Sequence, residues 1–215
     1  MIYLYSGVPG SSKSLHAAND IRYALSKPYG CDRPVIANFP LAEGARITRP
    51  QAFHHFDNDE LTPGLLVDFA EDYWAHADLS FREDWILLVL DEVQLVFNAR
   101  NWSDRGRSGR NDSRMDWLEF LSQHRKYGYK VILIAQSAKM IDNQFRMLIE
   151  IEINHRKVST MGGLGALISL PFMGRLFFWV SYLFQTNERL GMTCYIGRKA
   201  DFGMYDSYAK LRQRE

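Results

Sequence analysis

The sequence predicts an α/β fold in which a mostly parallel sheet is covered by helices and followed by a C-terminal β-hairpin. Residues 85–90 and 130–135 are almost uninterrupted apolar runs, which is typical of strands buried on both faces. Residues 2–5 are a third β-prone run, which leads through a glycine-rich turn into a helical pattern. With 215 residues and 47% hydrophobic content the chain can bury one sizeable core, so we predict a single domain over residues 1–215.

The first half of the chain supplies the next elements in order. Residues 15–25 place apolar side chains at helical spacing, and a following proline and glycine should end this helix near residue 26. Residues 34–39 predict a second short strand, whereas residues 41–62 are polar and mixed and predict no element. Thr62 and Pro63 provide a cap and a first-turn proline for a helix through residue 77.

The second half continues with helices and a further strand. Ser113 and Asp116 resemble a capping box, and they predict a helix that ends at Gly128. Residues 140–146 predict a short helix, and residues 147–153 predict a strand. Each of these elements is consistent with helices and strands that alternate around a buried sheet.

The amino-acid composition changes abruptly at residues 98–114. They contain five arginines and almost no apolar side chain, so we predict a mobile loop. Two interpretations of residues 105–114 remain open at this point. They could contact single-stranded DNA along a pore, or they could form a solvated loop without a ligand.

Residues 164–184 are apolar and about long enough to span a bilayer. Pro171, Gly174 and Arg175 interrupt the stretch, and an arginine at a helix centre costs about 2.5–3.5 kcal/mol on an insertion scale. We therefore prefer a hairpin appendage over residues 164–198, with strands at 176–184 and 192–197 and a turn at 187–191. Insertion of the apolar stretch into a membrane is the alternative.

Composition limits the classes of function. The formal net charge is +1, so a basic surface for nucleic acid must be local. Cys31 and Cys194 are too few for a disulfide framework and have no metal-ligand spacing. The chain does not start with a secretory signal pattern, and two reduced thiols are consistent with a cytoplasmic location.

Residues 7–14, GVPGSSKS, resemble the phosphate-binding pattern G-x-x-x-x-G-K-[S/T]. Gly7, Lys13 and Ser14 match it, whereas Ser12 replaces its second glycine, which should weaken nucleotide binding without abolishing it. In this pattern the lysine bridges the β- and γ-phosphates and the hydroxyl coordinates Mg²⁺. The residues expected to surround the phosphates are Gly7, Pro9, Gly10, Ser11, Ser12, Lys13, Ser14 and Leu15.

Polar side chains end both of the long apolar strands. Asp91 should hold the Mg²⁺ together with Ser14, Glu92 could polarise an attacking water, and Gln136 is placed to sense the γ-phosphate. Each feature alone is more often a surface turn or a solvated strand end. Their order along the chain favours a P-loop NTPase fold that binds ATP and Mg²⁺, because ligands of open α/β sheets gather at the carboxyl ends of strands.

These segments together resemble the zonula occludens toxin (Zot) domain, which is shared with filamentous-phage assembly ATPases. The resemblance rests on GVPGSSKS, ILLVLDEVQLVF, SQHRKYG, VILIAQSAKMID, EINHRKV and the terminal FGMYDSYA, and it covers nearly all of the chain. It implies a P-loop ATPase related to DNA-pumping motors, acting at the cytoplasmic face of the inner membrane in virion extrusion. The implied signature positions are Asp91, Glu92, Gln94, His124, Arg125 and Gln136.

The resemblance also has implications for membrane attachment. Family members commonly continue into a transmembrane anchor and an outer domain, and we recognise neither in this sequence. We therefore expect either a cytoplasmic fragment, whose membrane association would use a region absent from this chain, or a soluble relative. This sequence departs from the family pattern in two places. Ser12 and the arginine-rich loop at 98–114 are the departures. Nothing in the sequence supports secretion, so the toxin label is not transferred.

Motors of this class use an arginine from a neighbouring subunit, which predicts a homo-oligomer, with a ring as one form. Arg100, Arg125 and Arg146 are the candidates. For Arg125 the alternative is an ion pair with an acidic side chain at the end of its helix.

Three functions follow from these observations. The first is an oligomeric ATPase motor for phage assembly or DNA export, which would engage phage or membrane assembly proteins and single-stranded DNA. The second is an ATP-binding scaffold or switch with little turnover that recruits such partners. The third is a membrane-active protein that inserts residues 164–184. A small-molecule kinase is disfavoured because no second phosphate-acceptor signature is found.

Overall fold

The computed structural model describes residues 1–26, 33–42, 44–45, 47–97, 113–197 and 199–204. This part of the chain contains an eight-stranded sheet in the order β3-β2-β4-β5-β1-β6-β7-β8. The strands are β1 (Ile2–Ser6), β2 (Val35–Ala37), β3 (Phe53–His55), β4 (Ile86–Leu90), β5 (Tyr129–Ile134), β6 (Ile151–Lys157), β7 (Leu176–Leu183) and β8 (Glu188–Ile196). Strands β1 to β6 are parallel, and β7 and β8 are added as an antiparallel hairpin. The predicted fold class is therefore confirmed.

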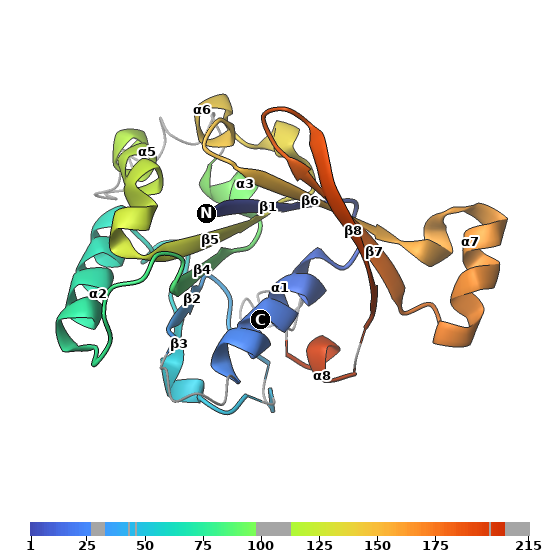
Figure 1. Ribbon diagram of the computed structural model, residues 1–215, viewed down its shortest axis with the longest axis horizontal. Coiled ribbons are helices and arrows are strands. Elements are labelled where there is room, and N and C mark those ends of the chain that lie inside the picture. Colours follow the sequence, from blue (N-terminus) through green and yellow to red (C-terminus); the bar gives the residue numbers. More distant parts are fainter. Residues whose placement is uncertain (27–32, 43, 46, 98–112, 198, 205–215) are drawn as a thin grey trace.

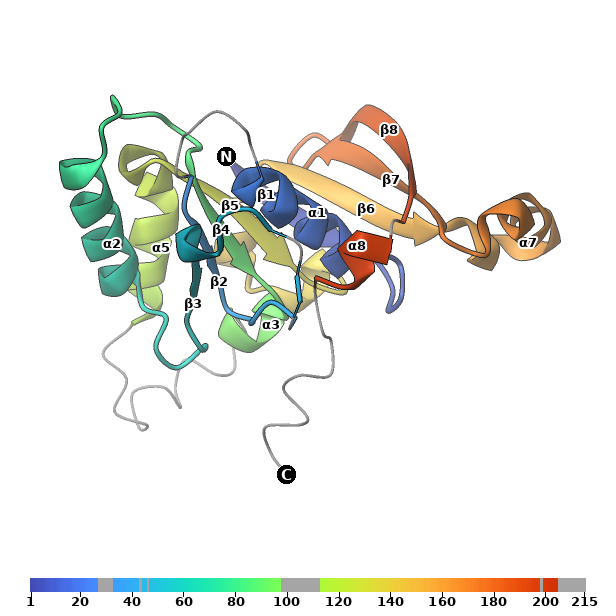
Figure 2. The same ribbon diagram turned by 90° about the horizontal axis from the view of Figure 1, so that it is seen from below.

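Helices cover both faces of the parallel sheet (Figures 1 and 2). The helices are α1 (Lys13–Leu25), α2 (Pro63–His76), α3 (Val93–Val96), α5 (Arg114–Gln123), α6 (Asn143–Arg146), α7 (Gly162–Ser169) and α8 (Lys199–Phe202). Short 3₁₀ turns are η1 (Pro50–Ala52), η2 (His124–Tyr127), η3 (Ala138–Met140), η4 (Val158–Thr160) and η5 (Leu170–Phe172). One face carries α1 and α8, and the other carries α2 and α5.

Successive side chains of the central strands enter different cores. Leu88 and Leu133 belong to the core under α2 and α5, whereas Leu87 and Ile132 belong to the core under α1. Side chains alternate between the faces of a strand, so a strand covered on both faces needs apolar residues at every position. This arrangement explains the uninterrupted apolar runs in the sequence.

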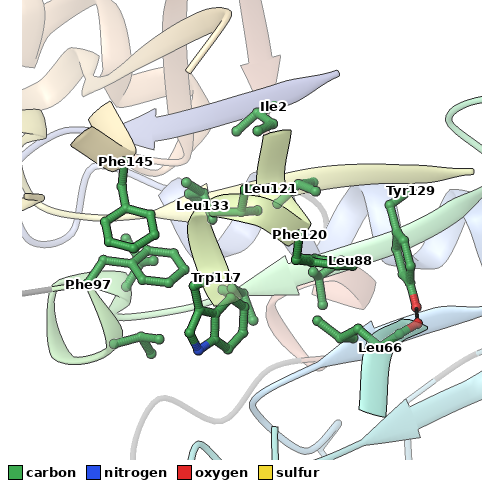
Figure 3. Packing of buried hydrophobic residues seen from close by; sticks show 14 of the residues in the cluster. Ile2, Leu66, Leu88, Phe97, Trp117, Phe120, Leu121, Tyr129, Leu133 and Phe145 are labelled. Atoms are coloured by element: carbon green, nitrogen blue, oxygen red, sulfur yellow. Dashed lines mark hydrogen bonds between the residues drawn. The ribbon is translucent and has the colours of Figure 1, made fainter. Parts of the chain in front are cut away.

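Aromatic side chains fill the core under α2 and α5 (Figure 3). The rings of Phe97 and Phe145 stack with centroids 4.4 Å apart, and Trp117 meets Phe97 edge to face. The buried Tyr129 donates a hydrogen bond to the Leu66 carbonyl at 2.6 Å, which satisfies its hydroxyl. This core joins α3, α5 and α6 to the central strands, and so fixes the elements that follow β4 and β5.

The local signals for helix boundaries are confirmed. The hydroxyl of Thr62 accepts a hydrogen bond from the Leu65 N–H at the start of α2. Ser113 and Asp116 form a capping box at the start of α5. This helix continues as η2, and Gly128 ends it with a φ of 79°, a conformation that glycine adopts readily.

Three strand predictions were wrong in their bounds by more than one residue. The strand predicted at 34–39 is β2, which ends at Ala37. The strand predicted at 147–153 is β6, and it extends to Lys157 because β7 pairs along its other edge. The second hairpin strand begins at Glu188 instead of residue 192. Asn187 takes a left-handed φ of 58°, so the turn is tight and pairing resumes at once.

Other differences concern short elements. The helix predicted at 140–146 is divided into η3 and α6, because the Asp142 side chain caps α6 and its N–H donates to Phe97. Strand β3 lies in a stretch without a predicted element, and α7 lies within the predicted hairpin appendage. The arginine-rich loop falls almost wholly on residues 98–112, which lie outside the described residues.

Candidate nucleotide-binding site

The loop between β1 and α1 has a backbone that needs glycine. Gly7 has a φ of 141°, and a Cβ at this position would lie 2.5 Å from the carbonyl oxygen of His155. Gly10 also has a positive φ, 74°. The N–H of Gly7 donates to the carbonyl of Gln136 at 3.3 Å, which ties the loop to the residue after β5. The loop is therefore a close turn beside the carboxyl ends of β5 and β6.

Ser12 occupies the position where the phosphate-binding pattern has its second glycine. It is the N-cap of α1, with a left-handed φ of 84° and no capping hydrogen bond from its side chain. Its hydroxyl is buried and has no hydrogen-bond partner among the described residues. A residue with a Cβ pays about 1–2 kcal/mol in this conformation. The backbone thus keeps the shape that glycine would favour.

Replacing Ser12 by glycine should tighten ATP binding severalfold, because about 1 kcal/mol of backbone strain would be relieved in a loop that must hold this conformation around phosphates. Titration calorimetry would measure the change. Ser12→Ala retains the Cβ and serves as the control, so its affinity should not rise. Unchanged or weaker binding by Ser12→Gly would contradict this role of the left-handed backbone.

Lys13 points back into the loop. Its Nζ donates to the carbonyls of Gly7 at 2.8 Å and Val8 at 3.2 Å. Burial lowers the pKa of Lys13, and this effect is opposed by the nearby carboxylates of Asp91 and Glu92. A half-buried ammonium group at the start of a helix is a favourable place for an anion.

The glycine loop and the end of β4 meet at Ser14. Its hydroxyl lies 3.4 Å from Oδ2 of Asp91, although the two residues are 77 positions apart. A hydroxyl and a carboxylate are both hard oxygen ligands of the kind that Mg²⁺ prefers. Groups of three or more histidine, cysteine or acidic side chains suited to a metal are not found among the described residues, so a metal here would also need oxygens from water or nucleotide.

Asn38 holds the backbone of Asp91 in place. Its Oδ1 accepts the Asp91 N–H at 2.7 Å, and its Nδ2 donates to the Asp91 carbonyl at 2.9 Å. Nδ2 also donates to Asn58 at 2.7 Å. Asn38 is fully buried just after β2, and its role was not predicted from the sequence. The available signal was a polar residue that directly follows a short apolar strand.

The two adjacent carboxylates lie in different surroundings. Asp91 is buried, and its Oδ1 accepts the Glu92 N–H at 2.7 Å. Glu92 is exposed and has a left-handed φ of 49° at the start of α3. The side-chain amide of the buried Gln94 donates to the Glu92 carboxylate. Strained backbone of this kind is concentrated at functional sites, and here it turns Glu92 away from the line of the strand.

Gln136 follows β5, which lies between β1 and β4 in the sheet. Its side chain is exposed, and its carbonyl accepts the hydrogen bond from Gly7. The structure therefore brings Gln136 to the same edge of the sheet as Lys13 and Asp91. Of the remaining loop residues, Ser11 is buried and Pro9 is exposed.

Arg125 lies away from this site within its own chain. It belongs to η2, which precedes the amino end of β5, and it forms an ion pair with Glu150. The other oxygen of Glu150 accepts the Ile2 N–H at 3.0 Å, at the amino end of β1. The alternative interpretation of Arg125, an ion pair with an acidic side chain, describes this arrangement. A role of Arg125 in a neighbouring subunit stays a prediction.

His124 is a further signature position, and Arg146 and Arg100 are the remaining arginine candidates. Arg146 donates to Asn143 at 2.6 Å within α6. Buried His124 donates from Nδ1 to the Leu121 carbonyl at 2.7 Å. His124 precedes Arg125 in η2, so it also lies near the amino end of β5. Arg100 lies outside the described residues.

A buried cluster beside the loop joins β1, α1, β6 and β7. The ring of His16 lies between Tyr5 and Trp179, with centroids 4.5 and 4.0 Å away. Nδ1 of His155 faces the Ser6 carbonyl at 3.2 Å, so it carries a proton and donates. Nε2 of neutral His155 therefore accepts from Nδ1 of His16 at 2.8 Å. Sequence spacing gives no sign of this pair, because 139 positions separate its members.

Acid should destabilise the protein through this cluster. Burial lowers the pKa of both His16 and His155 to about 3, so the unfolded chain takes up protons below about pH 6.5 while the folded chain does not. Each histidine then contributes a loss of about 2 kcal/mol of unfolding free energy between pH 7 and pH 5. Burial also raises the pKa of Asp20, which faces His16, and this acts in the opposite direction.

Urea unfolding at several pH values would measure this loss. In His16→Asn the amide can take the place of Nδ1, and about half of the loss should disappear. His76→Asn replaces an exposed histidine and should keep the full loss. Equal pH dependence in all three proteins would contradict the buried, neutral pair.

A pocket of about 240 Å³ opens beside the loop. It is lined by Gly10, Ser12, Lys13, Ser14, Leu15, Phe177, Asp201 and Phe202. Phe177 and Phe202 form its apolar end, with ring centroids 6.4 Å apart. Asp201 is fully buried, forms an ion pair with Arg22 of α1 at 2.8 Å and accepts a hydrogen bond from Tyr195. These contacts fix α8 at the edge of the pocket.

The comparison with known proteins decides the family. A family model described as Zonular occludens toxin (Zot) matches residues 1–211. The chain belongs to the Zot family. The Gene 1 protein of Enterobacteria phage M13 is 36% identical over 181 residues, which are 82% of this chain and 46% of that protein. The Gene 1 protein of Salmonella phage IKe is 37% identical over 93 residues, 42% of this chain and 24% of the relative. This Zot-family chain thus matches half or less of the length of these relatives.

Solved structures share the fold of this Zot-family chain. The N-terminal domain of zonular occludens toxin from Neisseria meningitidis has a TM-score of 0.57 at 17% identity, covering 95% of this chain and 98% of that one. The conjugation coupling protein TcpA of pCW3, with ATPγS, has a TM-score of 0.58 at 14% identity, with coverage of 100% and 65%. The DNA-packaging ATPase B204 from Sulfolobus Turreted Icosahedral Virus has a TM-score of 0.50 at 14% identity, with coverage of 90% and 96%.

The same comparison confirms the resemblance inferred from the sequence motifs, and the chain has a fold found in P-loop ATPases. Among the described helices, none combines the length and apolar character needed to cross a membrane.

Proposed function

We propose that this domain binds Mg²⁺ and ATP, hydrolyses the nucleotide, and works as one subunit of an oligomeric motor in filamentous phage assembly or DNA export. The observation that carries the proposal is the meeting of Lys13, Ser14 and Asp91 at one edge of the sheet, with a Ser14 to Asp91 distance of 3.4 Å. A phosphate loop and an acidic strand end must converge in this way to hold a metal-bound triphosphate.

Each part of the site has a proposed role. Lys13 and the loop N–H groups bind the phosphates, and Ser14 and Asp91 would hold Mg²⁺, which supplies charge neutralisation when bound. Glu92 accepts a proton from the attacking water and orients it, and Gln136 contacts the γ-phosphate. The aromatic end of the neighbouring pocket suits the nucleotide base, because bases stack on aromatic rings.

The relatives support the biological setting of the proposal. The matching Gene 1 proteins are phage proteins, and the structural neighbours include a DNA-packaging ATPase and a conjugation coupling protein. By analogy, we propose phage or membrane assembly proteins as partners and single-stranded DNA as a substrate, at the cytoplasmic face of the inner membrane. Longer relatives leave room for membrane association through a region outside this chain.

Oligomerisation should be required for turnover. Arg125 is paired with Glu150 at the far edge of the sheet, so we propose that a neighbouring subunit supplies the arginine that stabilises transition-state charge. The ATPase rate per subunit should rise with protein concentration, in parallel with an increase in mass measured in the presence of nucleotide. A constant rate per subunit from a protein that stays monomeric would contradict this mechanism.

A second candidate is an ATP-binding scaffold or switch with little turnover. The strained Ser12 in the phosphate loop favours it, because weaker nucleotide binding is compatible with recruitment but less so with rapid cycling. Phosphate release with and without single-stranded DNA separates the two functions.

A further inference from the structure

The segment between β6 and β7 exposes apolar side chains on a projection of the fold. Residues 158–174 contain no aspartate, glutamate, lysine, arginine or histidine. Within it, six large apolar side chains are 47–81% exposed. They are Met161, Leu164, Leu167, Ile168, Leu170 and Met173. Contiguous exposed apolar surface of this kind marks an interaction site. We refer to residues 158–174 as the apolar knob.

The apolar knob is a folded unit of η4, α7 and η5. Gly165 packs so tightly that an added Cβ would lie 2.3 Å from the Val158 carbonyl oxygen. The Ser169 hydroxyl donates to the Ala166 carbonyl at 2.9 Å, and the Gly174 N–H donates to the Ser169 carbonyl at 3.1 Å. The exposed side chains are therefore held outward by the fold of the knob itself.

The knob stands at one end of the molecule, apart from the other helices (Figures 1 and 2). It starts at the carboxyl end of β6, and β6 is parallel to β1, which leads into the phosphate loop. Strands β6 and β7 form the stalk of the knob, and Lys157 pairs with Phe177 at its base.

Three basic residues flank the base of the knob. Arg156 and Lys157 precede it and Arg175 follows it, and the antiparallel pairing of β6 and β7 brings these positions together. The sequence has no acidic residue between Glu152 and Glu188. An uncharged apolar tip with a basic collar is complementary to a bilayer with anionic headgroups, because the tip can enter the acyl boundary while the cations stay at the phosphates.

We propose that the apolar knob docks this domain onto an anionic lipid surface. The eight residues of α7 extend about 12 Å, which is far short of the ~30 Å hydrocarbon core, so the knob would lie in the interfacial layer. This contact would orient the nucleotide site relative to the membrane. It does not depend on ATP hydrolysis, and it can be tested without nucleotide.

Flotation of the full chain with lipid vesicles tests the proposal. Binding should be at least fivefold stronger to phosphatidylcholine vesicles with about one-third phosphatidylglycerol than to phosphatidylcholine alone. Leu164→Glu/Leu167→Glu should bind at least tenfold more weakly, because both exposed side chains would then carry charge. Met115→Glu changes a similarly exposed residue on α5 and should bind like the unaltered chain.

Three results would overturn the proposal. They are absence of flotation by the unaltered chain, equal loss of binding in Met115→Glu, and equal binding to both kinds of vesicle. Mass measurement without lipid addresses the competing protein interface. If the unaltered chain self-associates in solution and Leu164→Glu/Leu167→Glu makes it monomeric, the knob is a contact between subunits, and this result too would overturn the proposal. Unchanged thermal unfolding of the double variant would show that the fold is retained.

Discussion

ATP binding should fall about 100-fold or more when Lys13 is replaced by alanine, a loss of ~3 kcal/mol. The described structure places Lys13 inside the candidate phosphate loop, where it contacts the Gly7 and Val8 carbonyls. A triphosphate carries several negative charges in a partly desolvated site, so removal of this ammonium group leaves them uncompensated. Titration calorimetry with ATP would measure the loss, and phosphate release should fall with it.

Matched variants separate this effect from unfolding. Lys126→Ala removes an exposed lysine at the opposite edge of the sheet, and its ATP affinity should be unchanged. Thermal unfolding of Lys13→Ala would show whether the fold is retained, because the substitution also removes two loop hydrogen bonds. Near-normal ATP affinity of Lys13→Ala would remove the phosphate-loop assignment, and with it the motor and the scaffold proposals alike.

Turnover should fall about 10²–10⁴-fold in Glu92→Gln while ATP affinity stays within a few fold. Glutamine has nearly the same shape as glutamate and can still accept the hydrogen bond from Gln94, but it cannot accept a proton from water. The neighbouring Asp91, which is held by Asn38, keeps its place beside Ser14. Single-turnover phosphate release and calorimetry measure the two quantities separately.

Turnover of Glu92→Gln also decides between the motor and the scaffold. The control is Glu71→Gln, which alters an exposed glutamate on α2 and should retain full turnover. If the unaltered chain shows negligible turnover, with or without single-stranded DNA, and Glu92→Gln changes nothing, the scaffold is favoured. If turnover is appreciable and survives in Glu92→Gln, another residue activates the water.

Helix caps and apolar runs in the sequence predicted those elements whose position is set by residues close together in the chain. The caps at Thr62 and Ser113 gave the starts of α2 and α5, because a side chain that caps a helix acts within three positions. The apolar runs that became β4 and β5 were recognisable because burial on both faces removes every polar residue. Strand β6 was misplaced because its length depends on β7, which pairs with it from a later part of the chain.

The candidate site was predicted in part. Lys13, Ser14, Asp91 and Glu92 were identified because their order around strand ends is itself a pattern. Asn38 was not identified, since a single asparagine has no signature until β2 is placed beside β4.

By itself, the sequence determined the fold class and predicted the residues of the candidate phosphate loop, because both depend on composition and on the order of nearby residues. Only the tertiary structure decided which distant groups meet: Ser14 with Asp91, His16 with His155, and Arg125 with Glu150 at the edge away from the loop. It also decided that the apolar stretch after β6 projects outward. Such contacts arise from strand order and packing, which no local pattern records.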